Sequence, residues 1–161
     1  MLVVHTVSGA LALLIGFYVL CTAKGTRAHR RWGQLYSAAM YVLCFTSFGL
    51  YAIGGLAGTI FHVMSVVNAA LVTVGWSAAR WQLWGPRWFR VHFHYMSYSY
   101  YGLLMATDSH LLGYLPPWPL WAKAVLLWVL PYFIARALIQ RNYPRYAARF
   151  APAVPAAPLA V

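Results

Sequence analysis

The sequence predicts an all-α integral membrane protein: a bundle of five transmembrane helices. Of its 161 residues, 63% are hydrophobic and only 8% are charged, whereas a soluble domain carries about 25% charged residues. Five apolar stretches have the length of about 20 residues that a helix needs to cross a bilayer. These stretches are continuous and about twice as long as the alternating segments of a membrane β-barrel. Helices are therefore expected, because backbone groups in lipid must be paired within each segment.

Polar breaks separate the predicted helices along the chain. The first break is a basic segment at 24–31, the second is Gly54-Gly55, and the third is a basic segment around Gly85-Pro86. A proline-rich turn at 116–119 forms the fourth. The predicted spans are 2–22, 33–53, 57–79, 93–113 and 120–140.

These spans are expected to form one transmembrane domain, residues 1–141. The first four spans carry the polar faces, whereas the fifth has few polar residues and contains Pro131. We therefore expect the fifth helix to pack peripherally. Residues 142–161 are rich in Arg, Ala and Pro, a composition that predicts a disordered cytoplasmic tail.

The distribution of positive charge predicts the orientation. Every Lys and Arg except Lys123 falls in or beside the first break, the third break or the C-terminal region. Cytoplasmic segments carry this excess of positive charge in membrane proteins, so the N-terminus is expected outside and the C-terminus in the cytoplasm. Contact with anionic lipid accounts for the net charge of +11, and no nucleic-acid partner is needed to explain it.

The six histidines fall into two layers when this topology is followed along the chain. His5, His62 and His110 lie toward the outside, and His29, His92 and His94 lie at the cytoplasmic boundary. In the fourth span, His92 and His110 are 18 residues apart, which places them on one face, about 27 Å apart. His94 points about 200° away from His92.

Two interpretations of these histidines remain open. In the first, they hold a metal cofactor, and haem b is favoured because imidazoles from two facing helices are natural axial ligands. His29 with His92 or His94 would form the inner site, and a pair from His5, His62 and His110 the outer site. The same outer trio would also suit copper or zinc. The protein would then be a membrane redox or metal-binding subunit.

In the second interpretation, the histidines only form hydrogen bonds between helices and at the interface. The protein would then be a cofactor-free accessory or scaffold subunit that binds other membrane proteins. A small transporter or proton channel is a third class, but the shortage of charges at mid-membrane depth argues against it.

Independent catalytic activity is not favoured by the sequence. Asp108 is the only acid in the chain, so paired carboxylates for acid–base chemistry are absent. The sequence also lacks a nucleophile elbow, a phosphate-binding glycine loop and a dinucleotide fingerprint. Its two cysteines, Cys21 and Cys44, have no metal-ligand spacing, and a disulfide is not expected.

Several motifs resemble an uncharacterised family of small bacterial multi-pass membrane proteins, which is defined by a domain of unknown function. They are His5-x3-Gly9, Gly16, Lys24-Gly25-x3-His29-Arg30-x2-Gly33-x2-Tyr36-x3-Met40, Gly75-Trp76, His92-x3-Met96-x2-Ser99-Tyr100 and Ala106. The resemblance covers roughly residues 5–112. It implies a multi-pass protein of the bacterial inner membrane and no established activity. The placement of the histidines is also similar to that in cytochrome b-type four-helix bundles.

Overall fold

The computed structural model describes residues 1–50 and 55–150, with the backbone only for residues 55–59. All regular secondary structure in this part of the chain is helical, so the all-α class is confirmed. The elements are α1 (Leu2–Cys21), α2 (Arg27–Leu50), α3 (Gly55–Trp81), the 3-10 turn η1 (Gly85–Arg87), α4 (Trp88–Ser109), α5 (Leu120–Ala124), the π-helical segment η2 (Val125–Val129) and α6 (Leu130–Phe150).

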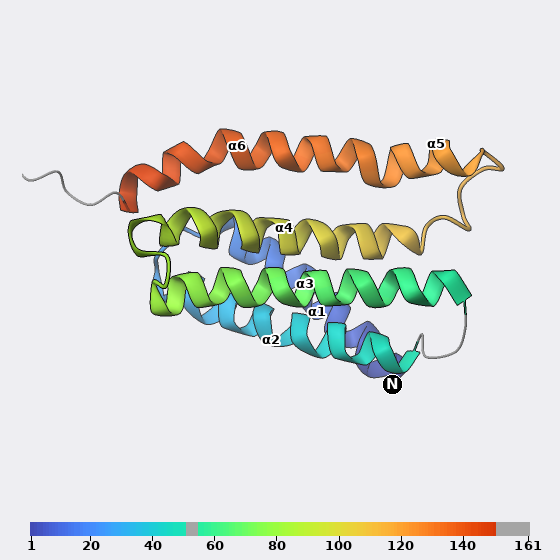
Figure 1. Ribbon diagram of the computed structural model, residues 1–161, viewed down its shortest axis with the longest axis horizontal. Helices are drawn as coiled ribbons and strands as arrows, with labels where there is room; N and C mark the ends of the chain where they lie inside the picture. The colour runs from blue at the N-terminus through green and yellow to red at the C-terminus, as the bar shows by residue number, and fades with distance from the viewer. Residues whose placement is uncertain (51–54, 151–161) are drawn as a thin grey trace, which may run out of the picture.

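Helices α1 to α4 form an antiparallel four-helix bundle (Figure 1). The packing is closest within the hairpins α1–α2 and α3–α4, and looser between α2 and α3 and between α4 and α1. Each helix therefore packs on the next one along the chain, and α4 packs on α1, so α2 and α4 lie diagonally opposite each other. Side chains that join α2 to α4 therefore meet across the bundle interior.

The last three elements form one long helix, Leu120–Phe150, on the outside of the bundle (Figure 1). It packs against α4, which agrees with the peripheral position expected for the fifth segment. Its π-helical segment lies just before Pro131. Proline has no N–H for the carbonyl of Leu127, four residues earlier, and its ring crowds that carbonyl, so the turn widens.

The structure supports a membrane protein but shows fewer clearly apolar helices than the sequence predicts. Within the described residues, three helices are long and apolar enough to cross a membrane: Leu2–Cys21, Ile60–Trp81 and Leu120–Phe150. Helices α2 and α4 are long enough, at 24 and 22 residues, but they carry more polar residues. The five-span topology is therefore still a prediction.

Several helix ends differ from the predicted ones. Helices α2 and α4 begin at Arg27 and Trp88 rather than at residues 33 and 93, because their polar first turns are helical too. The last helix continues to Phe150, so residues 142–150 are helical instead of belonging to the predicted tail. Residues 151–161 of that tail lie outside the described residues.

Aromatic packing explains the longer last helix. The ring of Phe150 stacks on Phe89 of α4 with 4.4 Å between the centroids. Tyr143 lies 5.7 Å from Phe93, and Tyr146 lies 5.9 Å from the same ring. These contacts give the end of α6 an apolar face. The arginine-rich composition of this segment, from which the tail was predicted, does not reveal that face.

A hydrogen bond ties α4 to the widened turn of the last helix. The Tyr101 hydroxyl donates to the Trp128 carbonyl at 2.7 Å. We expect Tyr101→Phe to lower the free energy of unfolding by about 1 kcal/mol, which is roughly 2–4 °C in the unfolding midpoint for a chain of this size. Thermal unfolding in detergent measures this change.

Tyr95→Phe is the matched control for this prediction, because Tyr95 is 39% exposed on the same helix. It should leave the unfolding midpoint unchanged. Equal midpoints for the two variants would contradict a stabilising role for the Tyr101 bond.

Candidate functional site

An inner histidine pair lies across the diagonal of the bundle. His29 near the start of α2 and His92 near the start of α4 are 63 residues apart in sequence. Their ring centroids are 6.3 Å apart, and the two ring planes are nearly perpendicular, at 88°. The structure therefore brings together the two histidines that the sequence placed in the inner layer on these helices.

A hydrogen bond fixes the orientation of the His92 imidazole, whereas one nitrogen of the His29 imidazole has no such bond among the described residues. His92 Nδ1 lies 2.8 Å from the Gly75 carbonyl. A carbonyl only accepts, so Nδ1 carries the proton and Nε2 keeps its lone pair. Among the described residues, the buried Nδ1 of His29 has no hydrogen-bond partner.

Lys24, in the connection between α1 and α2, lies at this end of the bundle. Its ammonium group donates to the carbonyls of Val19 and Leu20, both at 2.8 Å, and so caps the C-terminus of α1. It also lies 5.6 Å from the centre of the Tyr146 ring. Burial lowers the pKa of Lys24 to about 8, because the charged form loses hydration.

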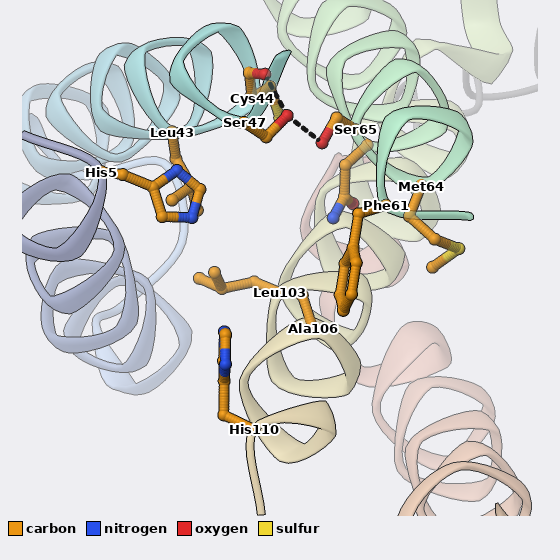
Figure 2. A pocket seen from close by; sticks show the side chains of 11 residues that line it. His5, Leu43, Cys44, Ser47, Phe61, Met64, Ser65, Leu103, Ala106 and His110 are labelled. Atoms are coloured by element: carbon orange, nitrogen blue, oxygen red, sulfur yellow. Dashed lines mark hydrogen bonds between the residues drawn. The ribbon is translucent and has the colours of Figure 1, made fainter. Parts of the chain in front are cut away.

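An outer cavity lies at the opposite end of the bundle, between the four helices. Its volume is about 50 Å³. Figure 2 shows the imidazoles of His5, from α1, and His110, at the end of α4, pointing into this space from two sides. Ser47 and Ser65 face each other on its far wall, joined by a hydrogen bond of 2.6 Å.

The His5 ring is held by a hydroxyl group of α2. Its Nδ1 lies 3.0 Å from Thr46 Oγ1. That hydroxyl directs its own proton to the carbonyls of Val42 and Leu43, at 2.8 and 3.0 Å. The hydroxyl oxygen must therefore accept from His5, which leaves His5 Nε2 with its lone pair.

Two predicted histidines do not join these sites. His62 is absent from the lining of the outer cavity; its ring stacks on Phe48 with 4.9 Å between the centroids. His94 faces the ring of Tyr143 at 4.9 Å, and its Nδ1 bonds to the Arg90 carbonyl at 2.8 Å. His94 thus turns away from His92, as the helical geometry predicts.

Asn68 is a cavity residue that sequence reasoning missed. It is 6% exposed and lines the outer cavity, and its Oδ1 has no hydrogen-bond partner in the described part of the chain. Gly102 makes room for it, since a Cβ there would lie 2.6 Å from Asn68 Oδ1. The sequence did contain a signal for this residue. Asn68 is an amide within the apolar span 57–79, and a polar side chain is costly in lipid unless it has a role there.

A dry layer separates the outer cavity from the inner pair. Met40 and Val72 lie one helical turn deeper than the cavity residues Cys44 and Asn68, and neither has any exposed surface. Leu103, 2% exposed, completes this layer with them. Such packing does not favour the hydrated path that a channel needs.

The described residues contain no group of three or more His, Cys, Asp and Glu side chains arranged to hold a metal ion. Of the predicted outer trio, His5 and His110 line the outer cavity. At each end of the bundle, two imidazoles from different helices remain as donors.

Apolar helices, with polar side chains turned into the bundle, define the protein as a membrane protein. The family model described as "Predicted membrane protein (DUF2306)" matches residues 2–139, and the chain belongs to this family of unknown function. The family resemblance found in the sequence is thereby confirmed. No curated protein and no solved structure matches the chain significantly.

Proposed function

We propose that the protein is a membrane redox subunit that binds one b-type haem between His29 and His92. The observation that carries this proposal is the 6.3 Å separation of the two ring centroids. Two imidazoles this close on facing helices could hold one metal ion between them.

The hydrogen bonding of His92 supports the same role. Histidines that bind a metal commonly donate the other ring N–H to a carbonyl or carboxylate, which fixes the ring and its tautomer. The Gly75 carbonyl receives the His92 Nδ1 proton at 2.8 Å, so Nε2 is the atom that would bind iron. The unpartnered, buried nitrogen of His29 fits a residue that lacks a ligand.

The position of the inner pair also supports the proposal. Cofactors in helical bundles bind in the interior, between side chains of facing helices, and α2 and α4 face each other across this bundle. Lys24, Arg27 and Arg90 add positive charge at this end, which suits the two carboxylates of haem. Haem bound there would accept and release one electron at a time.

The proposal includes the topology predicted from charge. Five spans in a bacterial inner membrane, with the N-terminus outside, would place the haem near the cytoplasmic surface. Most cations lie beside the connections at this end of the bundle. Arg136 is an exception, since it lies 14 residues before the end of α6 and on the exposed side of that helix. Its long side chain would reach toward the interface.

Optical spectra of the purified full-length protein test the proposal. Protein made in haem-replete cells should show a Soret band and a sharp α-band after reduction with dithionite. His29→Ala and His92→Ala should each retain less than about one fifth of the haem, because both imidazoles would hold it.

His94→Ala is the matched control, since this histidine lies two residues from His92 and faces Tyr143. It should keep the haem. A wild-type protein without haem, or haem that persists in His92→Ala, would overturn the proposal and favour the cofactor-free accessory subunit.

Chemical rescue separates lost ligation from lost folding. In His92→Gly, added imidazole can enter the space left by the side chain and replace the missing ligand. The Soret and α-bands should return with millimolar imidazole, and they should not return in a variant that has simply unfolded.

A further inference from the structure

We infer that the outer cavity binds a divalent transition-metal ion, copper or zinc, through His5 and His110, with the amide oxygen of Asn68 as a third donor. These three side chains come from α1, α4 and α3 and line the same space. The proposal is independent of haem binding at the other end of the bundle.

The His5 imidazole has the outer hydrogen bond that metal-binding histidines commonly have. The Thr46 hydroxyl accepts the Nδ1 proton of His5 at 3.0 Å, which leaves Nε2 as the donor atom on a ring that points into the cavity (Figure 2). An outer hydrogen bond of this kind sets the tautomer of a metal-binding histidine. His110 faces the same space from α4 (Figure 2).

Asn68 is the second, separate observation. Its side chain is more than nine-tenths buried, and Oδ1 has no hydrogen-bond partner among the described residues. A buried carbonyl oxygen without a partner costs about 1–3 kcal/mol. A metal ion, or a water molecule bound to it, would satisfy this oxygen.

The size and chemistry of the cavity select the class of ligand. About 50 Å³ holds an ion with a few waters, since one water needs roughly 10–15 Å³ of such space, but it is far below the roughly 300 Å³ of a typical small-molecule site. Imidazole donors suit copper and zinc, whereas calcium and magnesium prefer carboxylate oxygens, which the cavity lining lacks.

The outer cavity also offers a route for the ion. His110 follows the last residue of α4 and is exposed, whereas His5 is half-buried. The ion would therefore reach His110 first, from the aqueous side. Below the cavity, the dry layer of Met40, Val72 and Leu103 would stop it from crossing the bundle.

Titration with Cu²⁺ alone and with Zn²⁺ alone tests the inference. The full-length protein, purified without a histidine tag, should bind one ion of either metal. Electron paramagnetic resonance of the Cu²⁺ form should show coupling to two imidazole nitrogens. His5→Ala and His110→Ala should each weaken binding at least ten-fold and remove one nitrogen from the spectrum.

Thr46→Val tests whether the orientation of the His5 ring contributes to metal binding. It keeps both imidazoles but removes the acceptor for His5, and loss of such an outer partner weakens metal binding by about 10–100-fold. His94→Ala should bind as the wild type does, because His94 does not line the outer cavity. His92→Ala should also bind the ion normally, even if it loses haem, so the outer and inner sites are tested separately.

Three results would overturn the inference. They are the absence of saturable binding, binding that survives in the His5→Ala/His110→Ala double variant, and a spectrum without nitrogen coupling. In each case the outer cavity would hold water only. If all His5 and His110 variants fail to fold, the spectrum of the wild-type Cu²⁺ form still decides, because the absence of coupling to imidazole nitrogens contradicts the proposed ligation.

Discussion

In intact cells, a membrane-impermeant thiol reagent should label Tyr114→Cys and should leave Arg27→Cys and Arg87→Cys unlabelled. Tyr114 is 88% exposed and lies in the connection between α4 and α5, at the same end of the bundle as His110. Arg27 and Arg87 are exposed at the opposite end. The expected difference is all-or-none, because a charged reagent does not cross the hydrocarbon core.

Each cysteine would be introduced into a Cys21→Ala/Cys44→Ser background, which removes the native thiols. Permeabilised cells serve as the control, and there all three variants should react. If positions 27 and 87 reacted from opposite sides, the two histidine layers would not exist. If all three positions reacted in intact cells, the predicted orientation would be wrong.

Gly16→Val should lower the free energy of unfolding by about 3 kcal/mol, the upper part of the usual cost of overpacking. A Cβ at Gly16 would lie 2.5 Å from Tyr100 Cδ2 and 2.9 Å from Tyr36 Cε2. Neither ring can move cheaply. The Tyr36 hydroxyl bonds to Ser99 at 2.9 Å in the buried interior, and the Tyr100 hydroxyl donates to the Leu13 carbonyl at 3.2 Å.

The measured effect of Gly16→Val should be a fall of roughly 6–12 °C in the unfolding midpoint in detergent. Gly33→Ala is the control, because a Cβ there meets nothing within 4 Å. Alanine should raise stability slightly, by up to about 1 kcal/mol, since glycine is the poorer helix former. A valine at position 16 that leaves the midpoint unchanged would mean that α1 does not pack this closely on the two tyrosines.

Sequence patterns predicted the directions of neighbouring histidines where these depend on a single helix. The opposite directions of His92 and His94 follow from 100° per residue along one helix, and the structure has them facing Gly75 and Tyr143 respectively. Helix ends were predicted less well. Their position depends on tertiary packing, such as that of Phe150 on Phe89.

Pairing between helices could not be predicted from these patterns. The sequence proposed His5, His62 and His110 as equivalent members of an outer site, but the rotation of α3 turns His62 toward Phe48 and brings Asn68 to the cavity instead. A hydropathy profile treats Asn68 only as a polar interruption. It contains no information about the space that Gly102 leaves on the neighbouring helix.

The amino-acid sequence by itself determined the membrane class, the helical architecture and the two ends at which the histidines lie. Composition and spacing suffice for these properties, because the solvation of apolar surface and the pitch of a helix act locally along the chain. Only the tertiary structure decided which imidazoles meet. Placing His29 against His92 requires α2 and α4 to lie on a diagonal of the bundle, and that arrangement arises from side-chain packing among four helices at once.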